Sequence, residues 1–293
     1  MEILTIITPT YNRAELLKTL YESLERQYKR NFVWLIVDDG SIDNTEEVVE
    51  QLEKTATFPI YYVYKENGGK HTALNVGIRN VKTELTMIVD SDDQLLPCAM
   101  VEIENIHKKY KENRNIATYC FLRCFPDGKP VVALKQSEFV ESYIKYRIRE
   151  NRPGDMAEVF KTCVLRDIPF PEFRGEKFLS EDVVWIQIGL KYQFVFVNKS
   201  IYQCEYLEGG LTANDKPMKF ASPLGSMMRG KMLMHKECGI KQNIKGAIIY
   251  DCYSRNVDKG VFDERLALDG REKFFCLISW FISYFFYRKW KKR

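Results

Sequence analysis

The clearest chemical signal in the sequence is a run of acids, Asp90-Ser91-Asp92-Asp93, directly after an apolar segment that ends at Val89. Residues two apart in extended backbone point the same way, so Asp90 and Asp92 can face one ligand together. Carboxylates this close repel one another unless a cation compensates them. A hard divalent ion with oxygen ligands, Mg²⁺ or Mn²⁺ carried by a diphosphate, is the natural partner. The alternative interpretation is a solvated acidic turn.

A second polar cluster, Asp38-Asp39-Gly40-Ser41, follows an apolar segment that begins at Phe32. A carboxylate there can accept a hydrogen bond from a nucleotide base or ribose, and glycine lets the backbone approach a ligand closely. The same residues could instead form an ordinary turn between a strand and a helix, in which Asp and Ser only cap the helix. Taken alone, the cluster does not decide between these two roles.

The third signal is a glycine-rich segment before a helical pattern, Asn67-Gly68-Gly69-Lys70-His71-Thr72-Ala73-Leu74-Asn75-Val76-Gly77. Paired glycines at the start of a helix expose N–H groups, and Lys70 can contact a phosphate. The segment lacks the GxxxxGK[ST] spacing of a Walker motif. The alternative is a flexible turn followed by an ordinary helix start.

A fourth acidic pair, Glu181-Asp182, follows Ser180 at the start of a predicted helix. A carboxylate at a helix N-terminus tends to stay ionised, which suits a general base, although a low pKa also weakens a base. The alternative is plain charge complementarity with the positive end of the helix.

The first third of the chain alternates apolar runs with helical spacing, which predicts a βαβαβαβ order. The predicted strands are Ile3 to Thr8, Phe32 to Val37, Pro59 to Tyr64 and Leu85 to Val89. The predicted helices are Ala14 to Tyr28, a helix capped by Asp43 that runs to about Lys54, and Gly69 to Asn80. This order predicts a parallel sheet with helices on both faces. Ligands of such sheets bind beyond the carboxyl ends of the strands, where the first three polar clusters fall.

The rest of the chain is less regular until about residue 217, after which the pattern is helical. We expect a strand pair around the turn 126–128, a helix with Ser180 as its cap, and two later strands. The ranges are Ala117 to Leu122 with Pro130 to Leu134, Ser180 to Leu190, Phe194 to Val197, and Ile201 to Tyr206.

Composition excludes several classes of protein. The 293 residues are 45% hydrophobic and 29% charged, values of an ordinary globular chain with a sizeable core. Seven Lys or Arg and one acid lie between Arg271 and Arg293, a net charge of +6, so the rest carries about −2 of the total of +4. The main body is therefore not a nucleic-acid binder. Eight cysteines without a CxxC and three histidines argue against a zinc site and favour reduced thiols in the cytosol. The N-terminal segment does not read as a secretion signal.

The C-terminal tail, residues 271–293, combines a charge-free aromatic run with basic ends. The run from Phe274 to Tyr287 has fourteen residues, and five of the last six residues are basic. A transmembrane helix needs about twenty apolar residues, so we expect a helix that lies on an anionic membrane surface. The alternatives are a helix that docks on its own domain and a homodimer contact.

In order and spacing these segments resemble the family 2 glycosyltransferases of the GT-A fold, from Ile3 to about Asn214. The residues that carry the resemblance are Thr8-Pro9-Thr10-Tyr11-Asn12-Arg13, Asp38-Asp39-Gly40-Ser41, Asn67-Gly68-Gly69 through Asn75-Val76-Gly77, Asp90-Ser91-Asp92-Asp93 with Pro97, and Glu181-Asp182. The implied fold is α/β of the GT-A type, with a mostly parallel central sheet flanked by helices and a C-terminal helical appendage.

The resemblance also implies roles for the site residues. Tyr11 would stack on the nucleotide base, Asp39 would bind its edge, and Asp90 would contact the ribose side. Asp182 would be the catalytic base, with Glu181 as its neighbour or an acceptor contact. Mn²⁺ or Mg²⁺ would be bound by Asp92 and Asp93. Further donor contacts would come from Thr8, Pro9, Arg13, Asn67, Gly69, Lys70, Asn75 and Ser91. The segment 206–214 would be a mobile loop over the donor.

The predicted function is an inverting transfer of a sugar from a nucleotide diphosphate donor, by family default a UDP-sugar, to an acceptor hydroxyl. We expect a catalytic domain over residues 1–215, with a donor half (1–113) and an acceptor half (114–215), then a helical appendage (216–270) and the tail. The acceptor would be a glycan or glycolipid of cell-surface polysaccharide synthesis, and the enzyme would attach peripherally to the inner face of the cell membrane.

Three other functions are alternatives to this prediction. An inactive homologue that acts as a partner subunit would not need the intact acids. A sugar-phosphate nucleotidyltransferase would need a Gly-rich, Arg-containing loop after the first strand. The absence of a GxGxxG after the first strand argues against a dehydrogenase.

Overall fold

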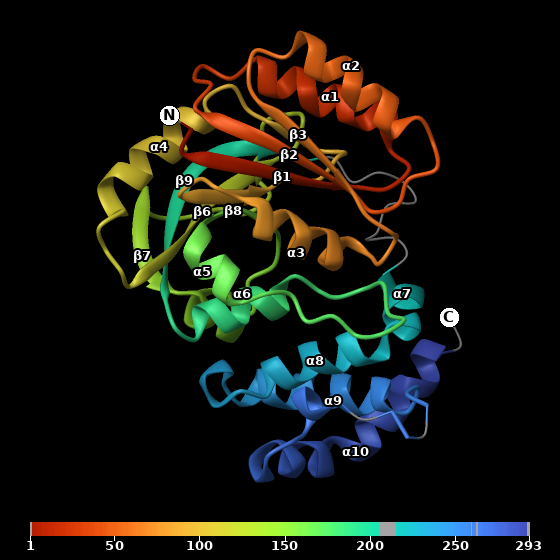
Figure 1. Ribbon diagram of the computed structural model, residues 1–293. Coiled ribbons are helices and arrows are strands. Elements are labelled where there is room, and N and C mark those ends of the chain that lie inside the picture. Colours follow the sequence, from red (N-terminus) through yellow and green to blue (C-terminus); the bar gives the residue numbers. More distant parts are fainter. Residues whose placement is uncertain (1, 205–214, 259, 262, 292–293) are drawn as a thin grey trace. The chain divides into compact units, whose positions relative to one another are not determined.

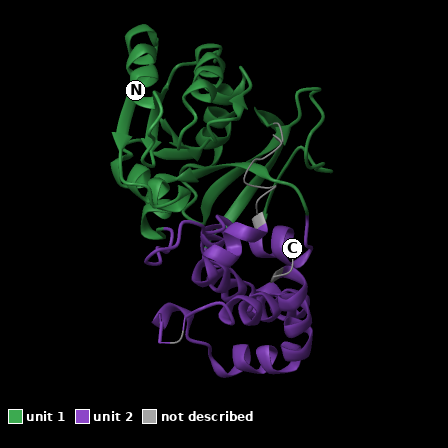
Figure 2. Ribbon diagram, turned by 90° about the vertical axis from the view of Figure 1, so that its right-hand side faces the viewer, with its two compact units in different colours: residues 1–141, 153–169, 192–206 green, residues 142–152, 170–191, 207–293 purple. Residues whose placement is uncertain are grey.

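The computed structural model describes residues 2–204, 215–258, 260–261 and 263–291, drawn in colour in Figure 1. The chain forms two compact units (Figure 2). Unit 1 comprises residues 1–141, 153–169 and 192–206, and unit 2 comprises residues 142–152, 170–191 and 207–293. This division differs from the expected domain ranges, because 142–152 and 170–191 pack with the C-terminal helices.

Unit 1 is built on one sheet, to which the described residues contribute nine strands in the order β3-β2-β1-β4-β8-β6-β9-β5, with β7 on β9. The strands are β1 (Leu4–Thr10), β2 (Phe32–Asp38), β3 (Ile60–Tyr64), β4 (Leu85–Ile88), β5 (Gln94–Leu95), β6 (Ile116–Cys124), β7 (Glu138–Ser142), β8 (Met156–Lys161) and β9 (Gln193–Gln203). β1 pairs in parallel with β2 and β4, and β2 pairs in parallel with β3. The parallel βαβαβαβ arrangement is therefore confirmed, and β8 adds antiparallel pairs beside β4 and β6.

Helices cover both faces of this sheet, as α1 and α3 show on opposite sides in Figure 1. The helices are α1 (Ala14–Glu25), α2 (Thr45–Thr55), α3 (Lys70–Asn80), α4 (Ala99–Tyr110) and α5 (Thr162–Asp167). Side chains alternate along a strand, so Leu4 and Ile6 enter the core with α1 while Ile7 faces α3, where Gly77 approaches it. The predicted helix from Gly69 begins at Lys70, with Gly69 as its cap.

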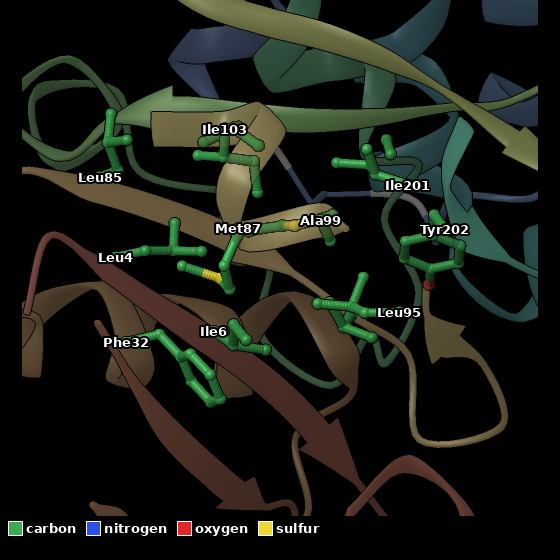
Figure 3. Close-up of a cluster of buried hydrophobic side chains, with 14 of the residues drawn as sticks. Leu4, Ile6, Phe32, Leu85, Met87, Leu95, Ala99, Ile103, Ile201 and Tyr202 are labelled. Carbon is green, nitrogen blue, oxygen red and sulfur yellow. The ribbon is translucent and has the colours of Figure 1, made fainter. Parts of the chain in front are cut away.

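The main core of unit 1 lies between the sheet and α1, α2 and α4. It gathers fully buried residues from β1, β2 and β4 with residues of α4 and β9, and Figure 3 shows part of it. Tyr202 contributes its ring to this core. The acidic run therefore follows a strand, β4, that is held in this core.

Two predicted strand assignments in the middle of the chain need correction. The predicted strand Pro130 to Leu134 is wrong, because beyond one isolated bridge from Pro130 to Cys124 the segment is irregular. Proline lacks the N–H that a strand ladder requires, which limits pairing there. The two predicted strands at 194–206 are one strand, β9, in which a register shift near Cys120 accommodates the polar Asn198 and Lys199. The end of that prediction and the predicted loop 206–214 lie outside the described residues.

Unit 2 is helical, as predicted for the C-terminal part. Its α-helices are α6 (Asp182–Gly189), α7 (Asp215–Ala221), α8 (Pro223–Leu233), α9 (Ile240–Ser254) and α10 (Gly270–Lys291). It also contains a π-helix, η1 (Ile144–Arg149), and two short 3₁₀-helices, η2 (Lys236–Cys238) and η3 (Glu264–Leu266). Glycines let α8 and α9 touch, since a Cβ on Gly230 would lie 2.7 Å from the carbonyl oxygen of Gly246. None of the helices in the described part of the chain is long and apolar enough to cross a membrane.

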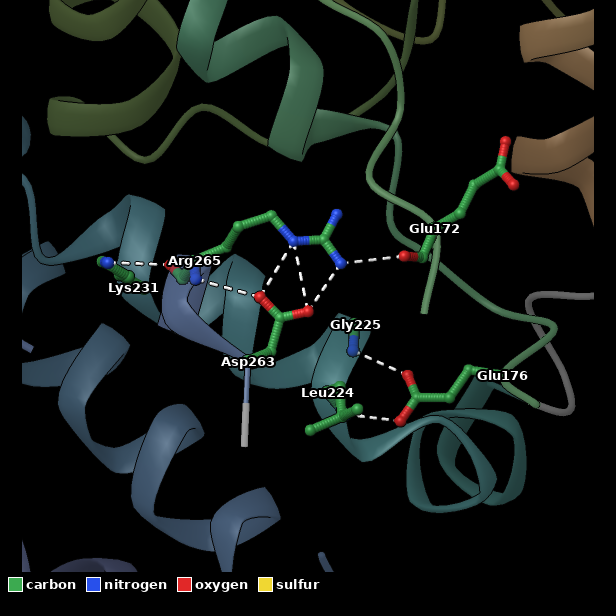
Figure 4. A network of polar contacts seen from close by, with 7 residues as sticks. All are labelled: Glu172, Glu176, Leu224, Gly225, Lys231, Asp263 and Arg265. Carbon is green, nitrogen blue, oxygen red and sulfur yellow. Dashed lines mark hydrogen bonds and ion pairs between the residues drawn. The ribbon is translucent and has the colours of Figure 1, made fainter. Parts of the chain in front are cut away.

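Polar contacts tie the segment 170–180 to α8 and η3 (Figure 4). Glu176 accepts the N–H groups of Leu224 (2.7 Å) and Gly225 (2.8 Å) at the start of α8. Burial raises the pKa of Glu176, and these two N–H groups partly offset that effect. Arg265 pairs with Asp263 and donates to the Glu172 carbonyl oxygen at 2.9 Å. The N-terminus of α8 is therefore firmly held, which fixes the helix that carries Arg229.

Candidate functional site

The loops that follow β1 and β2 are locked to each other. Asn12 has a positive φ of 51°. Its N–H donates to Ser41 Oγ at 2.8 Å, and its Oδ1 accepts the N–H of Ile42 at 2.8 Å. Tyr11 lies between these contacts and β1 with 47% of its surface exposed. An exposed aromatic ring on a fixed loop can stack on a flat ligand.

Two predicted donor residues of β1 instead have buried side chains. Thr8 Oγ1 accepts the indole N–H of Trp34 at 2.9 Å, and both residues are fully buried. Pro9 is also buried and pairs in the ladder with Val37. In this structure these two residues shape the strand that presents Tyr11.

Asp39 holds the glycine-rich segment after β3. Its carboxylate accepts the N–H groups of Gly68 (3.0 Å) and Gly69 (2.7 Å). It also pairs with Lys65 Nζ at 2.6 Å, and its backbone oxygen accepts from Asn67 Nδ2 at 2.8 Å. A carboxylate has about four acceptor positions, so three of them are in use here. The predicted donor residues Asp39, Asn67 and Gly69 are thus brought together.

Gly40 allows the second and third loops to meet. Its φ is +87°, a region that glycine occupies without penalty. A Cβ at this position would lie 2.7 Å from the backbone nitrogen of Asn67, a distance that real side chains do not adopt. Asp38 is buried beside it and accepts from Tyr62 Oη and from the N–H of Ser41, so Asp38 has a structural role.

The acidic turn after β4 meets cations from two other loops. Lys70 Nζ lies 2.5 Å from Asp90 Oδ1, and Arg13 Nη1 lies 3.1 Å from Asp92 Oδ2. Burial disfavours the charged form of Asp90, but Lys70 and other cations outweigh burial and lower its pKa. The turn therefore places Asp90 and Asp92 beside Lys70 and Arg13 at the carboxyl ends of β1 and β4.

Asp93 points away from that exposed edge. Tyr202 Oη donates to Asp93 Oδ2 at 2.6 Å and accepts the N–H of Asp90 at 3.2 Å. The guanidinium of Arg123 stacks 4.2 Å from the ring centre of Tyr202 and lies 3.7 Å from Asp93 Oδ2. Burial raises the pKa of Asp93 to about 6, although the Tyr202 hydrogen bond acts in the opposite direction. This inward arrangement does not favour the predicted metal role of Asp93.

The donor set nevertheless fits a hard cation at Asp92. Its carboxylate is partly exposed and pairs with Arg13, a contact that a divalent ion could replace. The described residues contain no group of three or more His, Cys, Asp or Glu side chains placed to hold a metal ion. A metal here would therefore take most of its ligands from a bound diphosphate or water, as Mg²⁺ often does.

The remaining predicted donor residues, Ser91 and Asn75, are both buried. Ser91 lies inside the acidic turn, and Asn75 lies in the second turn of α3. Asn75 therefore belongs to the helix that begins with Lys70, and Ser91 belongs to the turn that carries the acids.

Glu181 and Asp182 belong to unit 2. Glu181 occupies the N-cap of α6 and Asp182 is its first residue, so the predicted cap at Ser180 is shifted by one position. Ser180 Oγ donates to Asp182 Oδ1 at 2.7 Å, so the hydroxyl binds this carboxylate and does not cap the backbone of the helix. Arg229 Nε of α8 donates to both oxygens of Asp182, at 3.0 and 2.8 Å. Asp182 is thus oriented by a serine and an arginine.

Sequence reasoning missed four residues of these arrangements, and three of them had no sequence signal that tied them to a site. Arg123, Tyr202 and Arg229 lie 30 to 110 residues, in round terms, from the acids they contact, and only the fold brings them together. Lys65 could have been found, since it is a cation directly after β3 and next to the glycine-rich segment.

The sequence matches the family described as Glycosyl transferase family 2 over residues 5–170. Among curated relatives, an uncharacterized glycosyltransferase of Rickettsia typhi is 35% identical over 118 residues, which are 40% of this chain and 36% of the relative. One from Rickettsia felis is 28% identical over 218 residues, 74% of this chain and 35% of the relative. The matched part thus spans about a third of the length of these relatives.

Two solved structures share the fold at low sequence identity. Staphylococcus aureus TarS, crystallised with UDP-GlcNAc, has a TM-score of 0.64 at 18% identity over 87% of this chain and 72% of that one. The mannosyltransferase PcManGT of Pyrobaculum calidifontis, solved with GDP-Man and Mn²⁺, has a TM-score of 0.59 at 16% identity over 99% and 83%. The expected GT-A fold is confirmed. The match over more than half of the chain shows that it belongs to glycosyl transferase family 2.

Proposed function

We propose that this protein is an inverting, metal-dependent glycosyltransferase that moves a sugar from a nucleotide diphosphate sugar to an acceptor hydroxyl. One observation carries the proposal: the acidic turn after β4 meets Arg13 and Lys70 at the carboxyl ends of parallel strands. Arg13 and Lys70 are placed to contact a diphosphate, and Asp92 is placed to meet its metal ion. Family membership supports the same reaction class.

The donor half of the reaction is assigned to unit 1. The exposed ring of Tyr11 offers a stacking surface for the base, and Asp39 has one acceptor position left for the base edge. Asp90 is assigned to the ribose side. Lys70 and Arg13 would exchange their carboxylate partners for diphosphate oxygens.

The cofactor assigned to this site is Mn²⁺ or Mg²⁺, with Asp92 as its protein ligand. When bound, such an ion neutralises charge that develops on the departing diphosphate. The chain's own contribution is to hold Asp92 at the surface of a turn that Tyr202 fixes from below.

The acceptor half is assigned to Asp182 as general base. The acceptor oxygen forms a bond to the anomeric carbon while the bond from that carbon to the diphosphate oxygen breaks, and the acceptor proton passes to Asp182. Attack from the opposite face inverts the configuration. Arg229 and Ser180 keep the carboxylate in one orientation, which supports this role over that of Glu181.

Two finer assignments complete the proposal. The donor is a UDP-sugar, a hexose or N-acetylhexosamine, which is supported by the likeness in fold to TarS bound to UDP-GlcNAc. PcManGT binds GDP-Man on the same fold, so the nucleotide needs a direct test. The acceptor is a lipid-linked glycan of cell-surface polysaccharide synthesis.

A thermal-shift panel with UDP-GlcNAc, UDP-glucose and GDP-mannose, each with and without Mn²⁺, tests the donor. A donor at 100 times its dissociation constant stabilises by about 2.7 kcal/mol, which raises Tm by roughly 5–10 °C. Release of nucleoside diphosphate from the stabilising donor separates an enzyme from an inactive homologue. If no donor raises Tm, or if the rise in Tm is the same with and without Mn²⁺, the proposal is contradicted.

A further inference from the structure

The C-terminal helix α10 packs with small and polar side chains inward. Ser279 and Ser283 are fully buried. The Ser283 hydroxyl donates to the Trp280 carbonyl oxygen, and the thiol of Cys252 in α9 contacts the carbonyl oxygen of Ser283. Phe275 is the large side chain that joins the small core with Met234. Helix α10 lies beside α9 (Figure 1), and the face that it turns toward α9 is therefore not its main apolar face.

The large apolar side chains of α10 form an outward stripe. Leu277 and Phe281 are 74% and 80% exposed, and the other members are also more than half exposed. The stripe consists of Phe274, Leu277, Ile278, Phe281 and Phe285, which recur at the three- and four-residue spacing of one helix face. A continuous exposed apolar face of this kind marks a contact with another apolar phase.

Positive charge brackets the stripe without any acid on it. Lys273 lies exposed at its start, and Arg288 and Lys289 lie exposed at its end. Arg271 instead turns its guanidinium toward the protein, where it donates to the Met234 carbonyl oxygen and to Asn243 Oδ1. Glu272 is the single acid between Gly270 and Lys291, and it is buried, where it accepts the N–H of Asp269 at 2.9 Å.

Aromatic rings and a further cation border the stripe on one side. Arg255 lies 5.6 Å from the ring centres of both Trp280 and Tyr284, and Arg288 lies 6.0 Å from that of Tyr284. Half-exposed Trp and Tyr rings beside cations are typical of the boundary between lipid headgroups and acyl chains.

These charges favour a lipid surface over a second copy of the chain as the occupant. In an antiparallel pair of α10 helices, Lys273 would meet the cations at 288–289, and in a parallel pair each cation would meet itself. No acid on this face could compensate them. An anionic bilayer compensates every one of them and also receives the apolar stripe.

We propose that the outward face of α10 docks in the plane of an anionic membrane surface, such as the cytoplasmic leaflet. The stripe enters the headgroup boundary, and Lys273, Arg288 and Lys289 contact anionic headgroups. The binding itself is independent of sugar transfer. Its consequence, that the acceptor hydroxyl is presented on a membrane-borne molecule, rests on the proposed function.

Flotation of the full chain with vesicles tests the proposal without any catalytic readout. Vesicles of phosphatidylcholine alone are compared with vesicles that also contain phosphatidylglycerol. The double variant L277Q/F281Q removes two exposed apolar groups, and Ile240→Gln, an equally exposed apolar residue of α9, is the matched control. Truncation after Gly270 is a poorer test, because it would strip α9 of its packing partner.

We expect the wild type to float with anionic vesicles and the double variant to partition at least tenfold less, while Ile240→Gln floats like the wild type. R288Q/K289Q should bind about tenfold less at low salt, and 1 M salt should reduce wild-type binding but not abolish it. Unaltered circular dichroism of the variants shows that they fold.

Three results would overturn the proposal. The first is a wild type that stays at the bottom of the gradient with both kinds of vesicle. The second is a double variant that floats as well as the wild type. The third is sedimentation showing a dimer that L277Q/F281Q dissociates, together with no vesicle binding, since a second copy would then be the occupant. Loss of donor binding in the thermal-shift panel leaves the flotation result unchanged, so the two proposals fail separately.

Discussion

The carboxylates at the strand ends of unit 1 and the carboxylate of Asp182 in unit 2 are held in different ways. In unit 1, Asp90, Asp92 and Asp93 each meet a different cation or hydroxyl, and these partners come from several strands and loops. In unit 2, Asp182 meets Ser180 from its own helix start and Arg229 from α8. A distributed network can exchange single partners for a ligand, whereas a lone oriented carboxylate suits one proton transfer. The following predictions test that difference.

Asp92→Asn should have the largest effect in unit 1. The amide keeps the shape of the side chain but loses the charge that a divalent ion requires, so the Mn²⁺-dependent thermal shift by the donor and transfer itself should be abolished. Asp127→Asn, at an exposed acid paired with Lys129, is the control and should behave as the wild type. An unchanged Mn²⁺ dependence would remove Asp92 from the metal site.

Asp182→Asn should lower turnover by a factor of about 10²–10⁴, the usual range for a lost general base, and leave donor affinity nearly intact. Steady-state kinetics together with donor titration separate the two effects. Glu181→Gln is the matched variant one residue away. If Asp182→Asn turns over normally while Glu181→Gln is inactive, the base is Glu181.

Tyr202→Phe should have a smaller effect, because it removes one hydroxyl beneath the acidic turn. The N–H of Asp90 loses its acceptor and Asp93 loses its donor, and a buried unsatisfied group costs about 1–3 kcal/mol. We expect that loss in the free energy of unfolding and about tenfold weaker donor binding, with the turnover of bound donor retained. Equal donor affinity at reduced stability would mean that the hydroxyl supports the fold alone.

Substitution of Glu104 should have the smallest effect, because this residue belongs neither to the strand-end carboxylates of unit 1 nor to the surroundings of Asp182. Hydrogen bonds from Lys108 and Lys29 lower its pKa to about 2 from an ordinary 4.5. A lowered pKa adds stability that is complete above pH 4.5 and is lost as the pH falls toward 2. The contribution is about 1 kcal/mol or less because the pairs lie at the surface.

Thermal unfolding from pH 6 to pH 2 checks this prediction. Glu104→Gln should be slightly less stable than the wild type at pH 6, and the two proteins should converge near pH 2. A gap that stays constant with pH would show that the charge of Glu104 does not contribute.

Local sequence patterns were sufficient for the alternating elements and for the polar clusters at strand ends. The apolar runs at β1, β2 and β4 predicted the inner strands of the parallel half of the sheet, because a fully buried strand must be apolar on both faces. The predicted strand β3 is also present, as a partly exposed edge strand. The carboxyl ends of such strands meet at one edge, so the proximity of the first three clusters could be anticipated. The pairs of Asp39 with Gly69, Lys70 with Asp90 and Arg13 with Asp92 agree with that expectation.

Tertiary structure alone decided which way the side chains of those clusters point. Asp92 and Asp93 are neighbours in sequence, yet Asp92 faces Arg13 while Asp93 faces Tyr202, a residue of β9. Tyr202 lies more than 100 residues away, and no local pattern encodes a contact at that distance. For the same reason, Arg229 could not be linked to Asp182 from the sequence.

The tail shows the same division between sequence and structure. The sequence by itself determined that residues 271–291 form an aromatic, basic helix, because composition and spacing are local properties. It did not determine which face turns toward the protein, since several faces of this helix are apolar. The packing against α9 decided it: the small side chains of Ser279 and Ser283 allow close approach, and the bulky stripe of Leu277 and Phe281 remains outside.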